Sequence, residues 1–90
     1  MTTIQHDQAR HRFTATVDGH DAGLDYQLDD GCMVITHTGV PQPVEGRGIA
    51  SDLVQAAFEH ARDQRLSVRP QCAYAAGWVE RHPEFNQQLA

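Results

Sequence analysis

The segment Val40–Leu53, which reads VPQPVEGRGIASDL, joins a proline-rich loop to two glycines and then to the start of an apolar-periodic helix. Gly46 and Gly48 have no side chain to keep a ligand off the backbone, and the first four N–H groups of a helix have no intrahelical partner. Phosphate groups commonly bind at such a helix start. The segment therefore predicts either a backbone site for a phosphate or pyrophosphate, or a tight turn into the helix that binds nothing.

Two familiar phosphate-binding motifs do not fit this segment. The dinucleotide fingerprint needs a third glycine three residues after the second, where this chain has Ser51. The P-loop needs a lysine, and the chain contains none. A pyrophosphate at this loop would therefore be held by backbone N–H groups and not by a lysine side chain.

The composition indicates one small globular domain. The chain has 90 residues, of which 40% are hydrophobic and 21% charged, and its net charge is −5. A core of this size leaves no room for a large enclosed cavity, so a ligand is expected in a surface cleft. The acidic balance argues against nucleic acid as a partner. It suits either a cationic small molecule or basic peptide, or simply solubility.

The two cysteines and the N-terminal residues bear on localisation. Cys32 and Cys72 form no Cys-x-x-Cys pair, so neither a metal site nor a disulfide framework is expected. The first residues include no apolar signal segment, and no stretch approaches the ~18 apolar residues of a membrane span. We expect a soluble, reduced, cytoplasmic protein that does not bind a membrane.

The hydrophobic pattern predicts an α+β fold for residues 12–90, a single domain preceded by a flexible N-terminal arm of residues 1–11. Residues 12–18 and 24–28 alternate between apolar and polar, as half-buried strands do. Asp-Gly pairs follow both segments and favour tight turns. Residues 32–38 begin with a continuous apolar run, which is typical of a strand covered on both faces. These three strands are expected to form an antiparallel meander.

The segment after the glycines has the pattern of a β-α-β unit. Apolar residues recur every three or four positions from about residue 46 to 65, which predicts a helix, and residues 66–71 predict a strand. A short helix over residues 73–82 and a frayed tail from Glu84, with Phe85 packed back, complete the chain. Parallel strands joined by a crossover end at one edge of the sheet. The glycine loop and Cys72 are therefore expected to lie together at that edge, where ligands bind in open sheets.

Side chains at this edge include candidates for catalysis. Cys72 precedes the second helix, whose dipole lowers the pKa of a thiol, although a small buried apolar role is the common fate of a free cysteine. His37 ends the third strand and is either a base for an amine or a structural histidine. Tyr74 either donates a phenol proton or packs in the core with Trp78. Glu45 is expected to cap the helix start, and Cys32 to be packing.

The residues from His37 to Phe85 resemble the small single-domain GNAT-like acetyltransferases. The resemblance rests on histidine-threonine, the valine-proline loop, Glu-Gly-x-Gly-Ile-Ala, Pro-x-Cys-x-Tyr and Arg-His-Pro, which occur in that order. In the wider superfamily the loop begins with Gln or Arg and ends Gly-x-Gly/Ala. Gly48 and Ala50 match this pattern, whereas Glu45 stands at the leading position, a departure that the small family shares and that concerns loop detail.

The resemblance implies a cut-down GNAT fold that uses acetyl-coenzyme A as cosubstrate. It places the pyrophosphate of coenzyme A on the loop, and it makes Cys72 a catalytic candidate, with His37 and Tyr74 at other motif positions. The implied coenzyme A-binding residues are Val40, Glu45, Gly46, Arg47, Gly48, Ile49, Ala50 and Ser51.

Two functions follow from the resemblance. The first is transfer of an acetyl group to an amine or peptide acceptor, with Cys72 either as a covalent acetyl carrier or as a proton donor to the departing thiolate. The second is a non-catalytic module that binds coenzyme A or acyl-coenzyme A. The sequence identifies neither the acceptor nor the oligomeric state.

Overall fold

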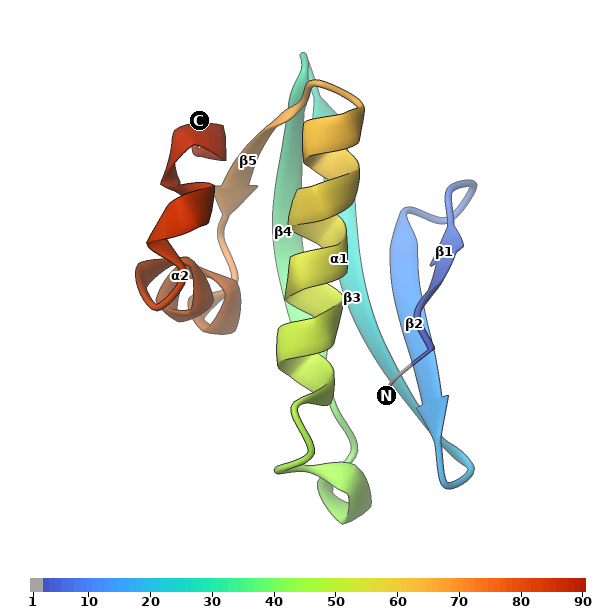
Figure 1. The fold of residues 1–90 in the computed structure, drawn as a ribbon. Helices are drawn as coiled ribbons and strands as arrows, with labels where there is room; N and C mark the ends of the chain where they lie inside the picture. The colour runs from blue at the N-terminus through green and yellow to red at the C-terminus, as the bar shows by residue number, and fades with distance from the viewer. Residues whose placement is uncertain (1–2) are drawn as a thin grey trace.

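The computed structural model describes residues 3–90, which form one mixed five-stranded sheet with two helices and two short 3-10 turns. The strands lie in sequence order from β1 to β5, and Figure 1 shows α1 on one face of the sheet, in front of β3 and β4. This arrangement belongs to the predicted α+β class. The elements are β1 (Gln5–Asp7), β2 (Arg12–Val17), β3 (His20–Asp29), β4 (Cys32–Gly39), η1 (Gln42–Val44), α1 (Ile49–Asp63), β5 (Ser67–Pro70), α2 (Ala73–Glu80) and η2 (Pro83–Gln88).

Two-residue loops set the register of the meander. Asp18-Gly19 joins β2 to β3 and Asp30-Gly31 joins β3 to β4, with positive φ at all four residues. Such loops have the twist that antiparallel strands need, and Asp and Gly adopt positive φ more readily than other residues do. The predicted meander and both hairpin turns are confirmed. β3 begins at His20, which is earlier than the pattern indicated, because His20–Gly23 pair with the second half of β2.

One face of the sheet is covered by α1 and α2. Leu53, Ala57 and Ala61 on α1 are fully buried, as their spacing of four residues predicts. Phe58 of α1 stacks on Trp78 of α2 with ring centroids 5.3 Å apart. Each large apolar side chain buried in this way contributes roughly 1.5–3 kcal/mol. Among the described residues, no helix is long and apolar enough to cross a membrane.

The N-terminal segment is more ordered than the sequence predicted. Residues 5–7 within the expected flexible arm form β1, which pairs antiparallel with β2. The His6 ring stacks on Phe13 with centroids 4.0 Å apart and bonds to the Tyr26 hydroxyl. A three-residue strand is too short to show a hydrophobic period, so only tertiary contacts reveal it. Residues 1 and 2 of the arm lie outside the described residues.

The C-terminal segment is also more ordered than predicted. The expected frayed tail forms η2, and Leu89 makes a parallel bridge with Val68 of β5. The amide of Ala90 donates to the Val68 carbonyl at 2.9 Å. Phe85 is buried against Phe58 and Trp78, as its apolar character indicated. The tail is therefore held by the outer edge of β5.

Two further details differ from the predictions. The helix begins at Ile49 and not near Gly46, because Gly46 and Gly48 have φ of 80° and 78°, which a right-handed helix does not contain. Leu28, expected on the inner face of β3, is 52% exposed. Leu28 is the last residue but one of β3, close to the hairpin, and the hairpin extends beyond the end of α1 (Figure 1).

β4 and β5 separate halfway along β4. They pair in parallel, as predicted, but only from Cys32 to Ile35 on the β4 side. The amides of Gln71 and Cys72 both donate to the Ile35 carbonyl, and the chain then leaves the sheet to begin α2. The second half of β4 keeps β3 as its only strand partner in the described chain. An opening therefore lies between the end of β4 and the start of α2.

Candidate active site

A cavity of about 430 Å³ lies at the end of β4, where the glycine loop, α1 and α2 converge. Thr38 of β4, Val40 directly after β4, and Tyr74 of α2 line the cavity. The remaining lining residues belong to the loop and the start of α1. They are Val44, Glu45, Gly46, Gly48, Ile49 and Ala50.

The loop directs backbone donors at this cavity. Gly48 is the N-cap of α1 in the left-handed conformation, and the first helical hydrogen bond runs from the Asp52 amide to the Gly48 carbonyl at 3.0 Å. The amides of Ile49, Ala50 and Ser51 precede that bond, so no earlier turn of the helix supplies their acceptors. With the positive end of the helix dipole behind them, these amides suit an anionic group.

Two of the predicted loop residues are directed elsewhere by their side chains. Arg47 forms an ion pair with Asp18 in the β2–β3 hairpin. Ser51 accepts a hydrogen bond of 2.9 Å from the indole N–H of Trp78. Neither residue lines the cavity. Their side chains hold the loop and the helix in place, and only their backbone amides, which belong to the same loop as the glycines, could contact a ligand. The other six predicted loop residues all line the cavity.

Cys72 is the N-cap of α2 and is partly buried at the opening between β4 and β5. Burial by itself raises the pKa of the Cys72 thiol, but hydrogen bonds from the backbone of Ala75, from the Thr38 side chain and from the backbone of Tyr74 and Thr38 outweigh it and lower the pKa. Backbone donors at a helix start favour the thiolate. Cys72 therefore has more thiolate at neutral pH than an ordinary cysteine.

Thr38 was not singled out for chemistry by the sequence. Its hydroxyl oxygen is buried and has no hydrogen-bond partner of normal geometry among residues 3–90. The same hydroxyl lies beside the Cys72 sulfur and contributes to the lowered pKa of that thiol. A buried hydroxyl without a full partner is uncommon in a folded protein. The Thr38 hydroxyl is thus available to the thiolate or to a ligand in the cavity.

His37 and Tyr74 lie on opposite sides of this end of β4. A bulge displaces Thr36 from the ladder, so that His37 pairs with Asp25 on the face of the sheet away from α1. His37 is exposed there and does not line the cavity, although it adjoins Thr38, which does. Tyr74 lines the cavity and is 37% exposed, so it is not the core residue that the alternative interpretation required. Of the Tyr74–Trp78 pair that could have packed in the core, only Trp78 is buried.

Comparison with known proteins places the chain in a family. The model of the GCN5-related N-acetyl-transferase family matches residues 12–89. The chain belongs to this family. Protein NATD1 of Gallus gallus is 35% identical over 83 residues, which cover 89% of this chain and 76% of that protein. Protein NATD1 of Homo sapiens is also 35% identical over 83 residues, covering 89% and 74%.

A solved structure of the family has the same fold. The solution structure of a GCN5-like candidate N-acetyltransferase from Staphylococcus aureus superposes with a TM-score of 0.77 at 25% identity. The match covers 98% of this chain and 87% of that one. Almost the whole fold of this chain is therefore represented in the solved structure.

Proposed function

We propose that this protein transfers an acetyl group from acetyl-coenzyme A to an amine. The observation that carries the proposal is the convergence of the α1 N-terminus with Thr38 at one cavity. Cys72 does not line this cavity, but its sulfur lies beside the Thr38 hydroxyl, which does. The loop amides would hold the pyrophosphate, and the thioester would lie at the opening between β4 and β5. Membership of the GCN5-related family supports acetyl-coenzyme A as the cosubstrate.

The cavity fits such a ligand in two respects. Its glycines bring the backbone to the surface, since nothing lies within 4 Å of a Cβ added at Gly46 or Gly48. The buried Thr38 hydroxyl is a donor without a full partner, suited to a carbonyl or a sulfur atom. Because Arg47 is paired with Asp18, charge on the phosphates would be balanced chiefly by the helix start and not by an arginine.

His37, Cys72 and Tyr74 have separate roles in the proposed reaction. The acceptor nitrogen forms a bond to the acetyl carbon and the carbon–sulfur bond breaks, while the proton lost by the nitrogen goes to His37. The departing coenzyme A thiolate takes a proton from the Cys72 thiol or from the phenol of Tyr74, which faces the cavity. Backbone amides at the end of β4 polarise the thioester carbonyl.

A second route passes through Cys72 itself. The Cys72 thiolate attacks the thioester, coenzyme A leaves, and the acceptor amine then takes the acetyl group from the cysteine sulfur. The donors around the Cys72 sulfur favour its thiolate form, and so this route. Denatured-protein mass after incubation with acetyl-coenzyme A distinguishes the routes, since only the carrier accumulates an acetyl adduct that is absent from Cys72→Ala.

The glycine loop offers a matched test of coenzyme A binding. Gly48→Ala and Gly19→Ala each place an alanine at φ near 78° and 76°, with no atom within 4 Å of the new Cβ. Each should lose roughly 1–2 kcal/mol of stability, the cost of the left-handed conformation for an L-residue. Calorimetric titration should show that Gly48→Ala alone loses coenzyme A affinity. Equal affinity in both variants would contradict a pyrophosphate site at the loop.

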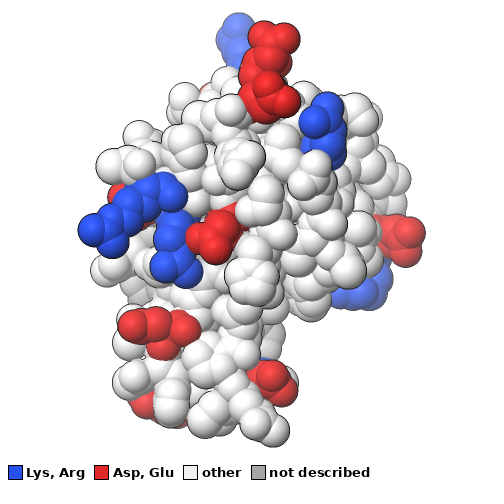
Figure 2. All heavy atoms as spheres, turned by 180° about the vertical axis from the view of Figure 1, so that it is seen from behind, with Lys and Arg blue, Asp and Glu red and all other residues white. Residues whose placement is uncertain are grey.

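The rival function is a module that binds acyl-coenzyme A without turning it over. It is favoured by the sheet face opposite α1, where Thr36 and His37 are exposed, so that any acceptor site there is shallow. Figure 2, the view from behind, shows acidic and basic side chains interspersed, with no large patch of one charge that would select an acceptor. Coenzyme A binding with no release of free thiol on a panel of amines and peptides would select this function.

A further inference from the structure

An arginine without a carboxylate partner lies beside the cavity. Arg81 is the C-cap of α2, and its guanidinium carbon is 5.9 Å from the centroid of the Tyr74 ring. This distance is within the range of a cation–π contact. Tyr74 lines the cavity, and Arg81 is exposed to solvent. Arg81 therefore brings a solvent-accessible positive charge to the α2 side of the cavity.

The geometry of α2 explains how this charge reaches Tyr74. Tyr74, Gly77 and Arg81 are spaced by three and four residues, so they share one face of the helix. Long side chains on a helix lean towards its N-terminus, and Gly77 has no side chain in the way. Nη1 of Arg81 lies 3.5 Å from the place that a Cβ on Gly77 would take. The arginine thus extends back along α2 from the end of the helix towards the cavity.

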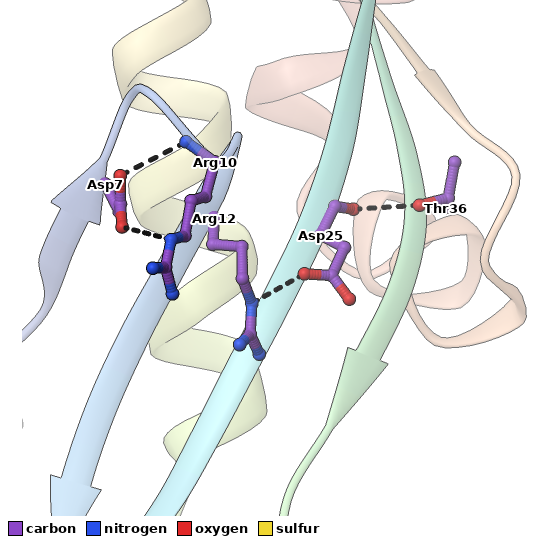
Figure 3. Close-up of polar contacts among 5 residues, drawn as sticks. All are labelled: Asp7, Arg10, Arg12, Asp25 and Thr36. Carbon is purple, nitrogen blue, oxygen red and sulfur yellow. Dashed lines mark hydrogen bonds and ion pairs between the residues drawn. The ribbon is translucent and has the colours of Figure 1, made fainter.

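The other arginines are either paired or directed away from the cavity. Three of them form ion pairs within residues 3–90, namely Arg10 with Asp7, Arg12 with Asp25 (both in Figure 3) and Arg47 with Asp18. Arg62 and Arg65 lie at or beyond the last turn of α1, about 20 Å from the helix start. Arg69 alternates with buried Val68 and so points to the opposite face of the sheet. Because the chain has no lysine, Arg81 is the free basic side chain nearest the cavity in the described chain.

Coenzyme A is too large for this cavity to enclose. A cavity of about 430 Å³ encloses most of a drug-sized ligand, and coenzyme A is larger than such ligands. With the thioester at the opening between β4 and β5 and the pyrophosphate on the loop, the adenosine and its 3′-phosphate remain outside. The 3′-phosphate is a monoester, which carries about −1.5 to −2 charges at pH 7. An exposed arginine at the edge of the cavity suits this group, since guanidinium binds phosphate through two parallel N–H···O bonds.

We infer that Arg81 binds the 3′-phosphate of coenzyme A, an inference that rests on the proposed function. The pyrophosphate keeps the loop amides and the α1 start, which together supply only a partial charge of about +0.5. Arg81 supplies a full positive charge on the α2 side. The contact with Tyr74 holds the guanidinium in place before the ligand arrives, so that less side-chain entropy is lost on binding. The adenosine end of coenzyme A therefore lies against α2.

Calorimetric titration with coenzyme A and with 3′-dephospho-coenzyme A tests the inference. The parent chain should bind coenzyme A about 10- to 100-fold more tightly, the range expected for charge-assisted hydrogen bonds. Arg81→Gln should lower the affinity for coenzyme A by that factor and leave the affinity for 3′-dephospho-coenzyme A unchanged. The preference for the phosphorylated ligand should then fall to about 1, because glutamine has no charge for the monoester to recognise.

Two substitutions at Gly77 separate the position of the arginine from its charge. Gly77→Ala puts a methyl group at ordinary contact distance from Arg81 and should keep the preference. Gly77→Leu fills the path of the arginine along α2 and should remove most of the preference, although Arg81 is still present. No other atom outside the backbone of the helix lies within 4 Å of a Cβ at Gly77, and both residues form helices better than glycine does. Both variants should therefore fold.

Arg62→Gln is the matched control. It removes an exposed arginine from the far end of α1 and makes the same change in net charge as Arg81→Gln. It should leave both affinities unchanged, which shows that the effect of Arg81→Gln is local and not a property of the net charge.

The outcomes separate this inference from the proposed function. Equal affinities of the parent chain for the two ligands, or a preference that persists in Arg81→Gln, would overturn the inference. An equal loss of both affinities in Arg81→Gln would also overturn it, because Arg81 would then contact the pyrophosphate. In each of these cases coenzyme A still binds and the proposed function stands. Binding of neither ligand to the parent chain would overturn the proposed function, and the inference with it.

Discussion

The two halves of β4 differ in what they pair with, and each half has a cysteine near it. Cys32 opens the half that has strands on both sides, and it is buried with its sulfur 3.8 Å from the Met33 carbonyl. Cys72 lies at the half that has lost β5, where backbone amides and the Thr38 hydroxyl point at its sulfur. The same residue type is thus packing in the closed half and a reactive group in the open half.

The difference follows from where backbone hydrogen bonds are satisfied. In the closed half, residues Cys32–Ile35 pair with β3 and with β5, so their donors and acceptors are occupied. In the open half, the strand keeps only β3 among the described strands, and the first amides of α2 donate to the Cys72 sulfur. A sheet that opens along one strand thereby gains a ligand-sized cavity without losing its core. Three predictions test this comparison, from the largest effect to the smallest, and a fourth concerns a region far from both halves.

The first prediction concerns activity. Cys72→Ala should lower acetyl transfer by about 10²- to 10⁴-fold, the range typical of a positioned proton donor or nucleophile. Cys32→Ala should leave the rate per folded molecule unchanged, because no described contact links its sulfur to the cavity. Release of free coenzyme A measures both. Equal losses in the two variants would erase the distinction between the halves.

The second prediction concerns stability. Met33 is fully buried in the closed half, so Met33→Ala should cost about 2–5 kcal/mol of unfolding free energy in urea. Thr38→Val in the open half should cost less than about 1.5 kcal/mol, since it removes at most one net hydrogen bond, the one to the Cys72 sulfur. A larger loss of unfolding free energy in Thr38→Val than in Met33→Ala would show that the open half contributes more to stability than the closed half.

The third prediction concerns thiol reactivity. At pH 7 iodoacetamide should alkylate Cys72 before Cys32, because hydrogen bonds lower the pKa of the Cys72 thiol and Cys32 is buried. Thr38→Val should slow alkylation of Cys72 about fivefold, the factor that one net hydrogen bond of about 1 kcal/mol represents. Mass spectrometry of tryptic peptides follows each site. An unchanged rate in Thr38→Val would show that the Thr38 hydroxyl does not lower the pKa of the Cys72 thiol.

The fourth prediction, with the smallest effect, concerns His6 on the edge strand β1, at the side of the sheet far from β4. Burial and the positive charge of His60 lower the pKa of His6, with Asp7 opposing and His11 adding slightly. Below about pH 6.5 His6 therefore binds a proton more readily in the unfolded chain than in the folded one. The free energy of unfolding should be highest above this pH and should decrease as the pH falls through the lowered pKa of His6. Thermal melts between pH 8 and pH 5 measure this change.

His6→Gln supplies the control for that measurement. It removes the titrating ring from β1 and should flatten the decline of melting temperature with acid, while the alkylation rate of Cys72 at a fixed pH should not move. If the variant declines as steeply as the parent chain, the remaining histidines and not His6 account for the acid sensitivity.

Local pattern alone was enough to predict most of the elements. The Asp-Gly pairs determine the hairpins because a two-residue loop needs positive φ at both residues, and Asp and Gly adopt it regardless of the rest of the chain. The spacing of Leu53, Ala57 and Ala61 determines α1 for a similar reason, since the period of a helix is short. The continuous apolar run from Cys32 to Ile35 predicted a buried strand, and all four residues are buried. The second covered face that the run also predicted is not formed by a helix, since α1 lies on the other side of the sheet.

Only the tertiary structure decided what depends on distant partners. β1 and the C-terminal bridge of Leu89 exist because Phe13, Tyr26 and Val68 are available to them, and no local period signals such contacts. The position of the Thr38 hydroxyl beside the sulfur of Cys72 depends on β5 leaving the sheet after Pro70. Residue spacing determines which element forms, whereas the meeting of side chains from different elements depends on how those elements pack.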